Sequence, residues 1–302
     1  MPVNIAPKWL GAATAPLKRV FLNCSGRLAF ERALRQAIPV LVYQMGKVGS
    51  SSVRWSLLQQ YPGAALHLHF FAPDHPDYQV RRLYRWAIAE RRPVNVISLT
   101  REPIGRNVSA FFQNFKRDTG VPFAQSTFSL RELRTLFLSK ARHDTPLVWF
   151  DRHTFRHFGI DVFETPFPES GVALYTRHNV RLLVLRSELA DDQKEAAIRE
   201  FLALPGFKLQ NFNVGAQKEY AATYKAFRAQ VTLPPDYVER MCQSKYFNHF
   251  YDRTTINAVR QRWLEPEPNL PTINAPAQTA AQASARAGRP DPGHARPLPV
   301  GR

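Results

Sequence analysis

A candidate anion-binding loop follows an apolar run early in the chain, in the stretch VYQMGKVGSSSVRW, residues 42–55. The apolar run stops at Gly46, passes Lys47 and Gly49, and continues into three serines. A strand that turns into a helix through glycines gathers unpaired backbone N–H groups at the positive end of the helix dipole, where a phosphate can bind. The structural alternative is a Gly-Lys turn followed by a serine N-cap. The loop candidates are Gly46, Lys47, Val48, Gly49, Ser50, Ser51 and Ser52.

A second cluster of oxyanion-binding side chains occurs in SLTREPIGRNVSAFFQNF, residues 98–115. Arg101 emerges where a β-branched run ends, Arg106 follows it, and Ser109 comes two helical turns later on the side that faces the strand end. A guanidinium binds a phosphate through two parallel hydrogen bonds, and a serine hydroxyl adds a donor. Val108, Phe111, Phe112 and Phe115 form an apolar stripe at helical spacing, which we interpret as core.

Two histidines are the best candidates for a general base. His67 and His69, in LHLHFF, lie two apart on a predicted strand and therefore point to the same face. Histidine titrates near neutrality, and ligands of an α/β sheet bind at strand ends, so His69 is our first candidate and His67 our second. A pair of structural histidines is the alternative. His75 is a weaker candidate in a loop.

An acceptor cleft could involve Trp149, Asp151 and Arg152, because an aromatic ring stacks on a sugar face while charged groups bind its hydroxyls. The alternative is an amphipathic helix that packs Trp149 and Phe150 inward. The histidines show no metal-ligand spacing, so we predict no metal.

These residues need a scaffold of alternating strands and helices. Strands are predicted at 38–45, 64–70 and 94–100, and helices at 26–37, 50–60, 76–91 and from 103 onward. This alternation favours a parallel, doubly wound sheet. After residue 120 the pattern is mostly helical. It includes a capping box at Ser129 and Glu132, a helix opening at 145–146, two strands within 171–189, a helix at 190–204 and three further helices before Trp263.

We therefore predict a P-loop-type, three-layer αβα fold with a central parallel sheet and a largely helical C-terminal half. The expected boundaries are an N-terminal arm at 1–25, one α/β domain at 26–264, and a disordered Pro/Ala-rich tail at 265–302.

Composition limits the classes of function. The net charge is +17, and only +1 of it falls on residues 265–302, so the folded part should attract anionic ligands. The two cysteines, Cys24 and Cys242, are too few for a disulfide framework and favour the cytoplasm. No apolar run approaches the roughly 20 residues of a membrane helix, although the basic arm with Trp9 allows peripheral contact with the inner face of the membrane.

The two oxyanion-binding stretches together resemble the sulfotransferases that use 3′-phosphoadenosine 5′-phosphosulfate (PAPS). In that family a lysine-containing Gly-Ser/Thr loop holds the 5′-phosphosulfate, and an Arg-x-Pro-x-x-Arg-x-x-Ser segment holds the 3′-phosphate. The first pattern falls on Lys47, Gly49, Ser50 and Ser51, and the second on Arg101, Pro103, Arg106 and Ser109. The His-x-His pair is similar to one in certain glycan 2-O-sulfotransferases, which use a histidine there as base. The family's Arg-Lys-Gly segment has no clear counterpart, and Lys218 or Arg186 are the candidates to replace it.

More narrowly, PLVWFDRHTFRHFGIDVFETPF and YFNHFYD resemble bacterial capsular polysaccharide synthesis proteins, over roughly residues 38–263. The resemblance implies sulfuryl transfer from PAPS, as donor substrate and without a metal, to a carbohydrate acceptor such as a capsular or surface glycan. Two alternatives stay open. One is a P-loop kinase-like phosphotransferase, although no Mg²⁺-holding acid and no lysine after the loop glycines are apparent. The other is a basic protein that binds polyanions or nucleic acid. The sequence does not give the oligomeric state.

Overall fold

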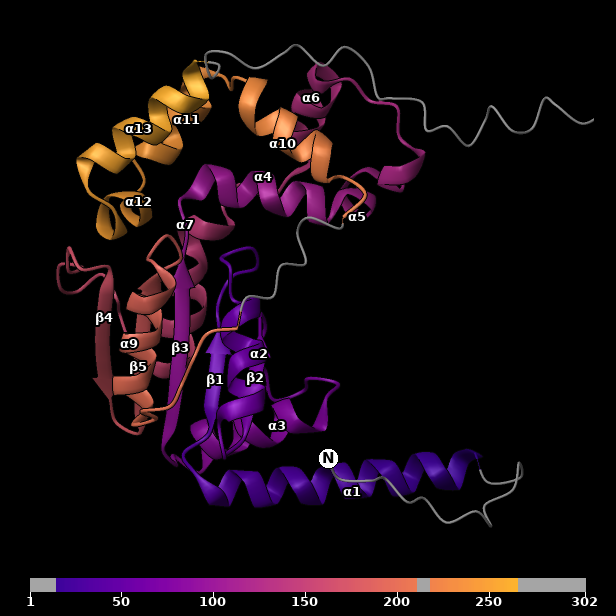
Figure 1. Ribbon diagram of the computed structural model, residues 1–302, viewed down its shortest axis with the longest axis vertical. Helices are drawn as coiled ribbons and strands as arrows, with labels where there is room; N and C mark the ends of the chain where they lie inside the picture. Colours follow the sequence, from indigo (N-terminus) through magenta and orange to yellow (C-terminus); the bar gives the residue numbers. More distant parts are fainter. Residues whose placement is uncertain (1–14, 211–217, 266–302) are drawn as a thin grey trace, which may run out of the picture.

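The computed structural model describes residues 15–210 and 218–265, with side chains from residue 26 onward. The predicted tail and most of the predicted N-terminal arm lie outside these residues. The described chain forms a sheet flanked by helices, with a second group of helices beyond the carboxyl ends of its parallel strands (Figure 1).

The sheet has five strands in the order β2-β1-β3-β5-β4. Strands β1, β2, β3 and β5 are parallel, and β4 pairs antiparallel with β5 at one edge. This confirms the predicted α/β class and the largely parallel sheet, while the two strands predicted within 171–189 form an edge hairpin. The strands are β1 (Val40–Tyr43), β2 (Ala65–Leu68), β3 (Val94–Thr100), β4 (Val172–Arg177) and β5 (Val180–Arg186).

Helices cover both faces of the sheet, as a three-layer fold requires. On one face, α2 and the chain that follows α9 are joined by a hydrogen bond from Gln60 Nε2 to the carbonyl oxygen of Lys208 (2.7 Å). On the other face, α3 and the α7–α8 region meet where the rings of Tyr84 and His157 lie 6.1 Å apart. These helices are α1 (Ala15–Gln36), α2 (Ser51–Gln60), α3 (Tyr78–Tyr84) with a π-helical turn at Arg85–Ala89, α7 (Thr145–Phe150) with a π-helical turn at Asp151–Phe155, α8 (Arg156–Phe158) and α9 (Asp191–Leu202).

A second group of helices lies beyond the carboxyl ends of the parallel strands (Figure 1). Four helices follow α9 in the described residues, so the prediction of three was wrong. The extra helix, α12, is separated from α11 by Ser244, whose side chain accepts a hydrogen bond from the backbone N–H of Phe247 (3.2 Å). The group comprises α4 (Pro103–Gln113), α5 (Phe115–Thr119), a 3-10 turn (Phe123–Gln125), α6 (Leu130–Lys140), α10 (Ala221–Gln230), α11 (Pro235–Cys242), α12 (Lys245–Phe250) and α13 (Arg253–Leu264).

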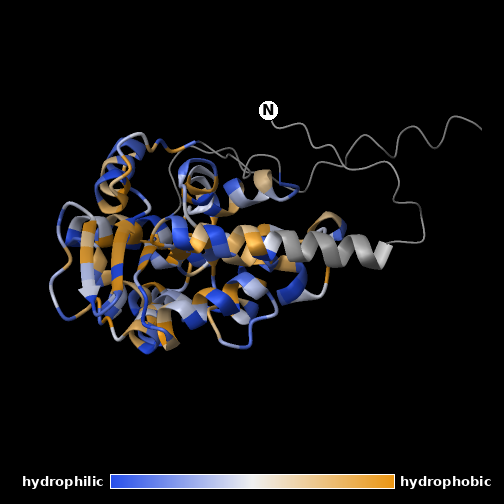
Figure 2. Cartoon of the chain, turned by 90° about the horizontal axis from the view of Figure 1, so that it is seen from below, coloured by the Kyte–Doolittle hydropathy of each residue, from blue (hydrophilic) through white to orange (hydrophobic). Residues whose placement is uncertain are grey.

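The core is continuous between sheet and helices. Every residue of β3 is buried, and the predicted apolar stripe of α4 is buried as well, with Phe111 fully inaccessible to solvent. Figure 2 shows the strands as largely apolar, with hydrophilic residues gathered on the surrounding helices and loops. Burial of this stripe holds α4 next to the carboxyl end of β3. It also determines which way the remaining, polar face of α4 points.

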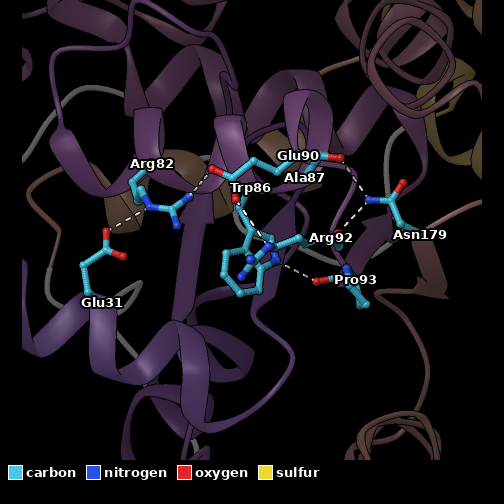
Figure 3. A network of polar contacts seen from close by, with 8 residues as sticks. All are labelled: Glu31, Arg82, Trp86, Ala87, Glu90, Arg92, Pro93 and Asn179. Atoms are coloured by element: carbon cyan, nitrogen blue, oxygen red, sulfur yellow. Dashed lines mark hydrogen bonds and ion pairs between the residues drawn. The ribbon is translucent and has the colours of Figure 1, made fainter.

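Polar contacts close the opposite, amino end of the sheet (Figure 3). Arg82 forms ion pairs with Glu31 of α1 (2.9 Å) and with Glu90 (3.1 Å). The side-chain amide of Asn179, just before β5, donates to the carbonyl oxygen of Arg92, just before β3 (2.7 Å). These contacts tie α1, α3 and the starts of two strands together.

Candidate active site

The predicted anion-binding loop connects β1 to α2. Lys47 and Gly49 both have positive φ, 76° and 79°, which is a strained conformation for the lysine and an easy one for the glycine. Ser50 is buried at the start of α2, and Ser51 is the first residue of the helix. Val48 is fully buried in the core, so it offers the loop only its backbone. The loop is therefore a tight turn that leads directly into the N-terminus of α2.

The second predicted motif contacts this loop directly. Nη1 of Arg101 donates to the carbonyl oxygen of Lys47 (3.0 Å), and Nε of Arg106 donates to that of Gly46 (2.9 Å). The contact follows from the topology, since β1 and β3 are neighbours and their carboxyl ends meet at the same edge. Arg106 is 6% exposed and also donates to the side-chain oxygen of Asn107 (3.0 Å). It therefore acts mainly by positioning the loop.

Helix α4 begins at this edge through a side-chain cap. Glu102 accepts a hydrogen bond from the backbone N–H of Gly105 (2.7 Å). A Cβ on Gly105 would lie 1.9 Å from that carboxylate oxygen, so a larger residue there would displace the Glu102 cap. The cap sets the rotation of α4 that turns Arg106 and Ser109 toward the loop.

Gln113 is a site residue that the sequence analysis missed. Its side-chain oxygen accepts hydrogen bonds from Nζ of Lys47 (3.3 Å) and from the hydroxyl of Tyr220 (3.2 Å), and Nζ of Lys218 contacts it too. Gln113 comes four residues after Ser109 and therefore shares its helix face. This i, i+4 spacing from Ser109 could have identified Gln113 in the sequence. Lys218, a predicted replacement for the Arg-Lys-Gly segment, thus lies near Lys47.

The site is strongly electropositive. The pKa of Lys47 is lowered to about 8, first by burial and then by the positive charges of Lys218, Arg101 and Arg106. Burial also lowers the pKa of Arg106, to about 10, so this guanidinium stays charged at neutral pH. Burial opposes the charge of Arg101 as well, but Tyr224 and two carboxylates outweigh it and raise its pKa. A cluster of charged, partly desolvated cations favours an anionic ligand.

The histidine pair lies beside the loop, with ring centroids 5.0 Å apart. Nδ1 of His69 lies 2.8 Å from the carbonyl oxygen of Gln44, which can only accept, so Nδ1 carries a proton and the neutral ring has its free lone pair on Nε2. Nε2 of His69 is 3.8 Å from where a Cβ on Gly46 would sit. Nε2 of His67 is instead engaged by Ser50 Oγ (2.9 Å), and burial lowers the pKa of His67 to about 4. The geometry therefore favours His69 as the proton acceptor.

The loop, the two arginines, Gln113 and the histidine pair line one cavity of about 650 Å³. Val48 and Ser52 are not among its lining residues, and neither are His75 and Arg186. Arg186 lies elsewhere, where its guanidinium contacts the carbonyl oxygen of Glu169. The predicted site residues that line the cavity are Gly46, Lys47, Gly49, Ser50, Ser51, His67, His69, Arg101, Arg106 and Ser109.

The predicted acceptor cleft needs a correction. Asp151 and Arg152 are exposed and do not line the cavity, whereas Trp149 does, together with His153, which the sequence analysis did not single out. Trp149 is 3% exposed and its ring is stacked on that of His153 (centroids 5.0 Å apart, 19° between planes). Trp149 therefore supports His153 and has no open face for a sugar. The amphipathic-helix interpretation of this segment, with Trp149 and Phe150 inward, was the correct one.

Carboxylates are scarce around the cavity. Within residues 26–210 and 218–265, its only acidic lining residue is Asp118, which forms an ion pair with Arg117 (2.8 Å). The same residues contain no group of three or more potential metal-binding side chains. No described helix has both the length and the apolar character that crossing a bilayer requires.

Comparison with known proteins supports the capsular resemblance. Residues 126–252 match the family model described as "Putative capsular polysaccharide synthesis protein". Neither curated proteins nor solved structures gave a match. The matched segment contains the cavity residues Arg142, Thr145, Trp149 and His153, whereas the loop and the Arg101 motif precede it.

Proposed function

We propose that this protein is an enzyme that transfers a sulfuryl group from PAPS to a hydroxyl of a carbohydrate. The observation that carries the proposal is the pair of hydrogen bonds from Arg101 and Arg106 to the loop carbonyls at 3.0 and 2.9 Å. They join the two oxyanion-binding motifs in one cavity, close enough for opposite ends of one bisphosphorylated adenosine. The loop and Lys47 would hold the 5′-phosphosulfate, and Arg101 with Ser109 would hold the 3′-phosphate.

Lys47 would stabilise the transition state. When the sulfuryl group leaves, the bridging oxygen on the 5′-phosphate becomes negative, and an ammonium group held near it lowers the barrier. Nζ of Lys47 is turned to the neutral oxygen of Gln113 (3.3 Å). No carboxylate holds it there, so an anion can attract it without breaking an ion pair.

His69 would act as the general base. Its unprotonated Nε2 faces the loop, while the bond from Nδ1 to a backbone carbonyl fixes the tautomer. Nε2 takes the proton of the acceptor hydroxyl as that oxygen bonds to sulfur, and the sulfur–oxygen bond to the 5′-phosphate breaks. The products are a sulfate ester and adenosine 3′,5′-bisphosphate, with the proton on His69.

A carbohydrate is the acceptor that the family match favours. The matched segment, residues 126–252, matches a model named for capsular polysaccharide synthesis, and it supplies lining residues of the cavity, among them Arg142, Thr145 and His153. A capsular or other surface glycan precursor is therefore the expected substrate.

Thermal-shift titration distinguishes this function from its alternatives. Adenosine 3′,5′-bisphosphate should raise the midpoint of unfolding without Mg²⁺, since a ligand that binds only the folded state stabilises it by mass action. Stabilisation by ATP with Mg²⁺, but not by the bisphosphate, would instead identify a kinase. A response to DNA alone, with steep salt dependence, would identify a polyanion-binding protein.

A further inference from the structure

Two histidines face the same cavity with opposite proton positions. His69 offers an unprotonated Nε2, as its bond to the carbonyl of Gln44 requires. His153 differs, because its Nδ1 lies 2.6 Å from the hydroxyl of Tyr43. Tyr43 is fully buried and its pKa is raised by that burial, so its hydroxyl keeps a proton that needs an acceptor. Nδ1 of His153 is that acceptor, which leaves the imidazole proton on Nε2.

His153 is therefore a fixed hydrogen-bond donor toward the cavity. Three contacts fix its ring: the Tyr43 hydroxyl at Nδ1, the stacked ring of Trp149, and the edge of Tyr43, 5.5 Å away between centroids. It belongs to the π-helical turn Asp151–Phe155, a local widening of the helix that often occurs at functional sites. In this turn Asp151 and Arg152 point to solvent, while His153 lines the cavity.

The wall around His153 also contributes a cation and a hydroxyl. Arg142 and Thr145 line the same cavity, and no carboxylate forms an ion pair with Arg142 in the described part of the chain. The Thr145 hydroxyl donates to the carbonyl oxygen of Arg142 (3.2 Å), which leaves its lone pairs for another donor. The loop and Arg101 line the same cavity, and a donor nucleotide bound by them would leave the charge of Arg142 available for a second anion.

We propose that Arg142, Thr145 and His153 form an acceptor subsite for an acidic saccharide, with a sugar carboxylate bound by Arg142 and a ring oxygen or hydroxyl bound by Nε2–H of His153. The proposal rests on the proposed function and gives its acceptor class. A carboxylate accepts two parallel hydrogen bonds from a guanidinium, which a neutral sugar cannot do. The subsite also lies within the segment that matches the capsular family, residues 126–252.

Calorimetry with a matched pair of sugars tests the subsite. A glucuronic acid-containing tetrasaccharide and its carboxyl-reduced counterpart are titrated into the full chain, with adenosine 3′,5′-bisphosphate present. The acidic sugar should bind about 10- to 100-fold more tightly, the range expected for a hydrogen bond to a charged group. Arg142→Gln should remove the preference, whereas Arg131→Gln, at an exposed position on α6 outside the cavity, should keep it. Equal affinity for the two sugars, or no binding of either, would overturn the proposal.

His153 needs its own test, because its variants could alter packing. His153→Phe keeps an aromatic ring on Trp149 but removes the donor, and it should weaken binding of the acidic tetrasaccharide about tenfold. Affinity for adenosine 3′,5′-bisphosphate should not change. Tyr43→Phe removes the group that fixes the tautomer and should have a smaller effect of the same kind. Wild-type affinity of His153→Phe for the sugar would contradict its role.

The two proposals fail in different ways. If the bisphosphate does not bind but the sugar preference is present, the proposed reaction is wrong and the acidic-sugar subsite remains. If the bisphosphate binds and the sugar preference is absent, only the subsite is wrong.

Discussion

The positively charged side chains at the two ends of the sheet have different interaction partners. At the amino end, Arg82 and Arg92 have acidic partners within the protein (Figure 3). Arg82 pairs with Glu31 and Glu90. Arg92 lies over the ring of Trp86, 4.5 Å from its centroid, and approaches Glu90 (3.4 Å).

At the carboxyl end, the three cations of the two predicted anion-binding motifs donate hydrogen bonds to neutral partners. Arg101 and Arg106 donate to loop carbonyls, and Lys47 donates to the amide oxygen of Gln113. None of these three forms an ion pair within residues 26–210 and 218–265. Lys47 therefore has no carboxylate partner to raise its pKa. Burial and the like charges around it disfavour its ammonium form and lower that pKa.

The difference in partners distinguishes residues that stabilise the fold from residues that are available to bind a ligand. At the amino end, the arginines have acidic partners within the protein and contribute to the stability of the fold. At the carboxyl end, the cations are partly desolvated, and binding of an anion would offset that cost. We expect changes at the amino end to alter stability and changes at the carboxyl end to alter binding and turnover.

The largest effect is expected for a histidine at the carboxyl end. His69→Asn should lower turnover by about 10²- to 10⁴-fold, the usual contribution of a general base. Nucleotide affinity should stay near that of wild type. The control is His178→Asn, in the exposed turn between β4 and β5 at the amino end, where φ is 53° and asparagine is tolerated. Sulfuryl transfer to an acceptor, followed with radiolabelled donor, provides the measurement. If both variants are fully active, His69 is a structural residue.

Arg101 and Arg82 form a matched pair of arginines. Arg101→Gln should weaken binding of adenosine 3′,5′-bisphosphate by about 10- to 100-fold, because it removes a charged hydrogen-bond donor. Arg82→Gln should lower the midpoint of thermal unfolding and leave that affinity unchanged. Calorimetric titration and thermal unfolding measure the two properties separately. Normal binding by Arg101→Gln would show that the 3′-phosphate site is assigned wrongly.

The pH dependence of kcat/KM for PAPS should report on Lys47. Its lowered pKa means that the neutral amine replaces the ammonium above about pH 8, so kcat/KM should fall there. Lys47→Arg keeps its charge and should extend the plateau beyond about pH 9, even if its maximal rate is lower. Identical alkaline limbs in the two proteins would exclude Lys47 as the titrating group.

The smallest effect concerns the cap of α4. Gly105→Ala places a Cβ on the Glu102 carboxylate and should lower the free energy of unfolding by about 1 to 2 kcal/mol, the range for loss of an N-cap. Gly206→Ala, where a Cβ would meet no atom within 4 Å, should be near neutral. Denaturant unfolding gives both values. Equal stability of the two variants would mean that the cap is not needed.

Local patterns in the sequence predicted much of the fold. The β-branched run 94–100 is β3 with the predicted bounds, and Ser129 with Glu132 forms the predicted capping box. The first helix was predicted over residues 26–37, whereas α1 begins at Ala15 and includes Gly26. Periodicity and capping act over a few residues, so the sequence contains what is needed to predict them.

The site residues could be predicted only where a motif lies within one short segment of the sequence. The loop and the Arg101 motif each follow a single strand, and the parallel sheet brings them together. Lys218 and Gln113 are 105 residues apart, and no local pattern pairs them. His153 was missed because a π-helical turn shifts the residues that face inward, and α-helical periodicity does not predict such a turn.

Competition among three nucleotides tests whether the two motifs hold opposite ends of one nucleotide. Calorimetry without Mg²⁺ should give adenosine 3′,5′-bisphosphate an affinity at least about tenfold above those of the 3′- and 5′-monophosphates, because each phosphate contributes charged hydrogen bonds. Arg101→Gln should reduce its affinity to that of the 5′-monophosphate. A bisphosphate that binds no more tightly than either monophosphate would contradict the account.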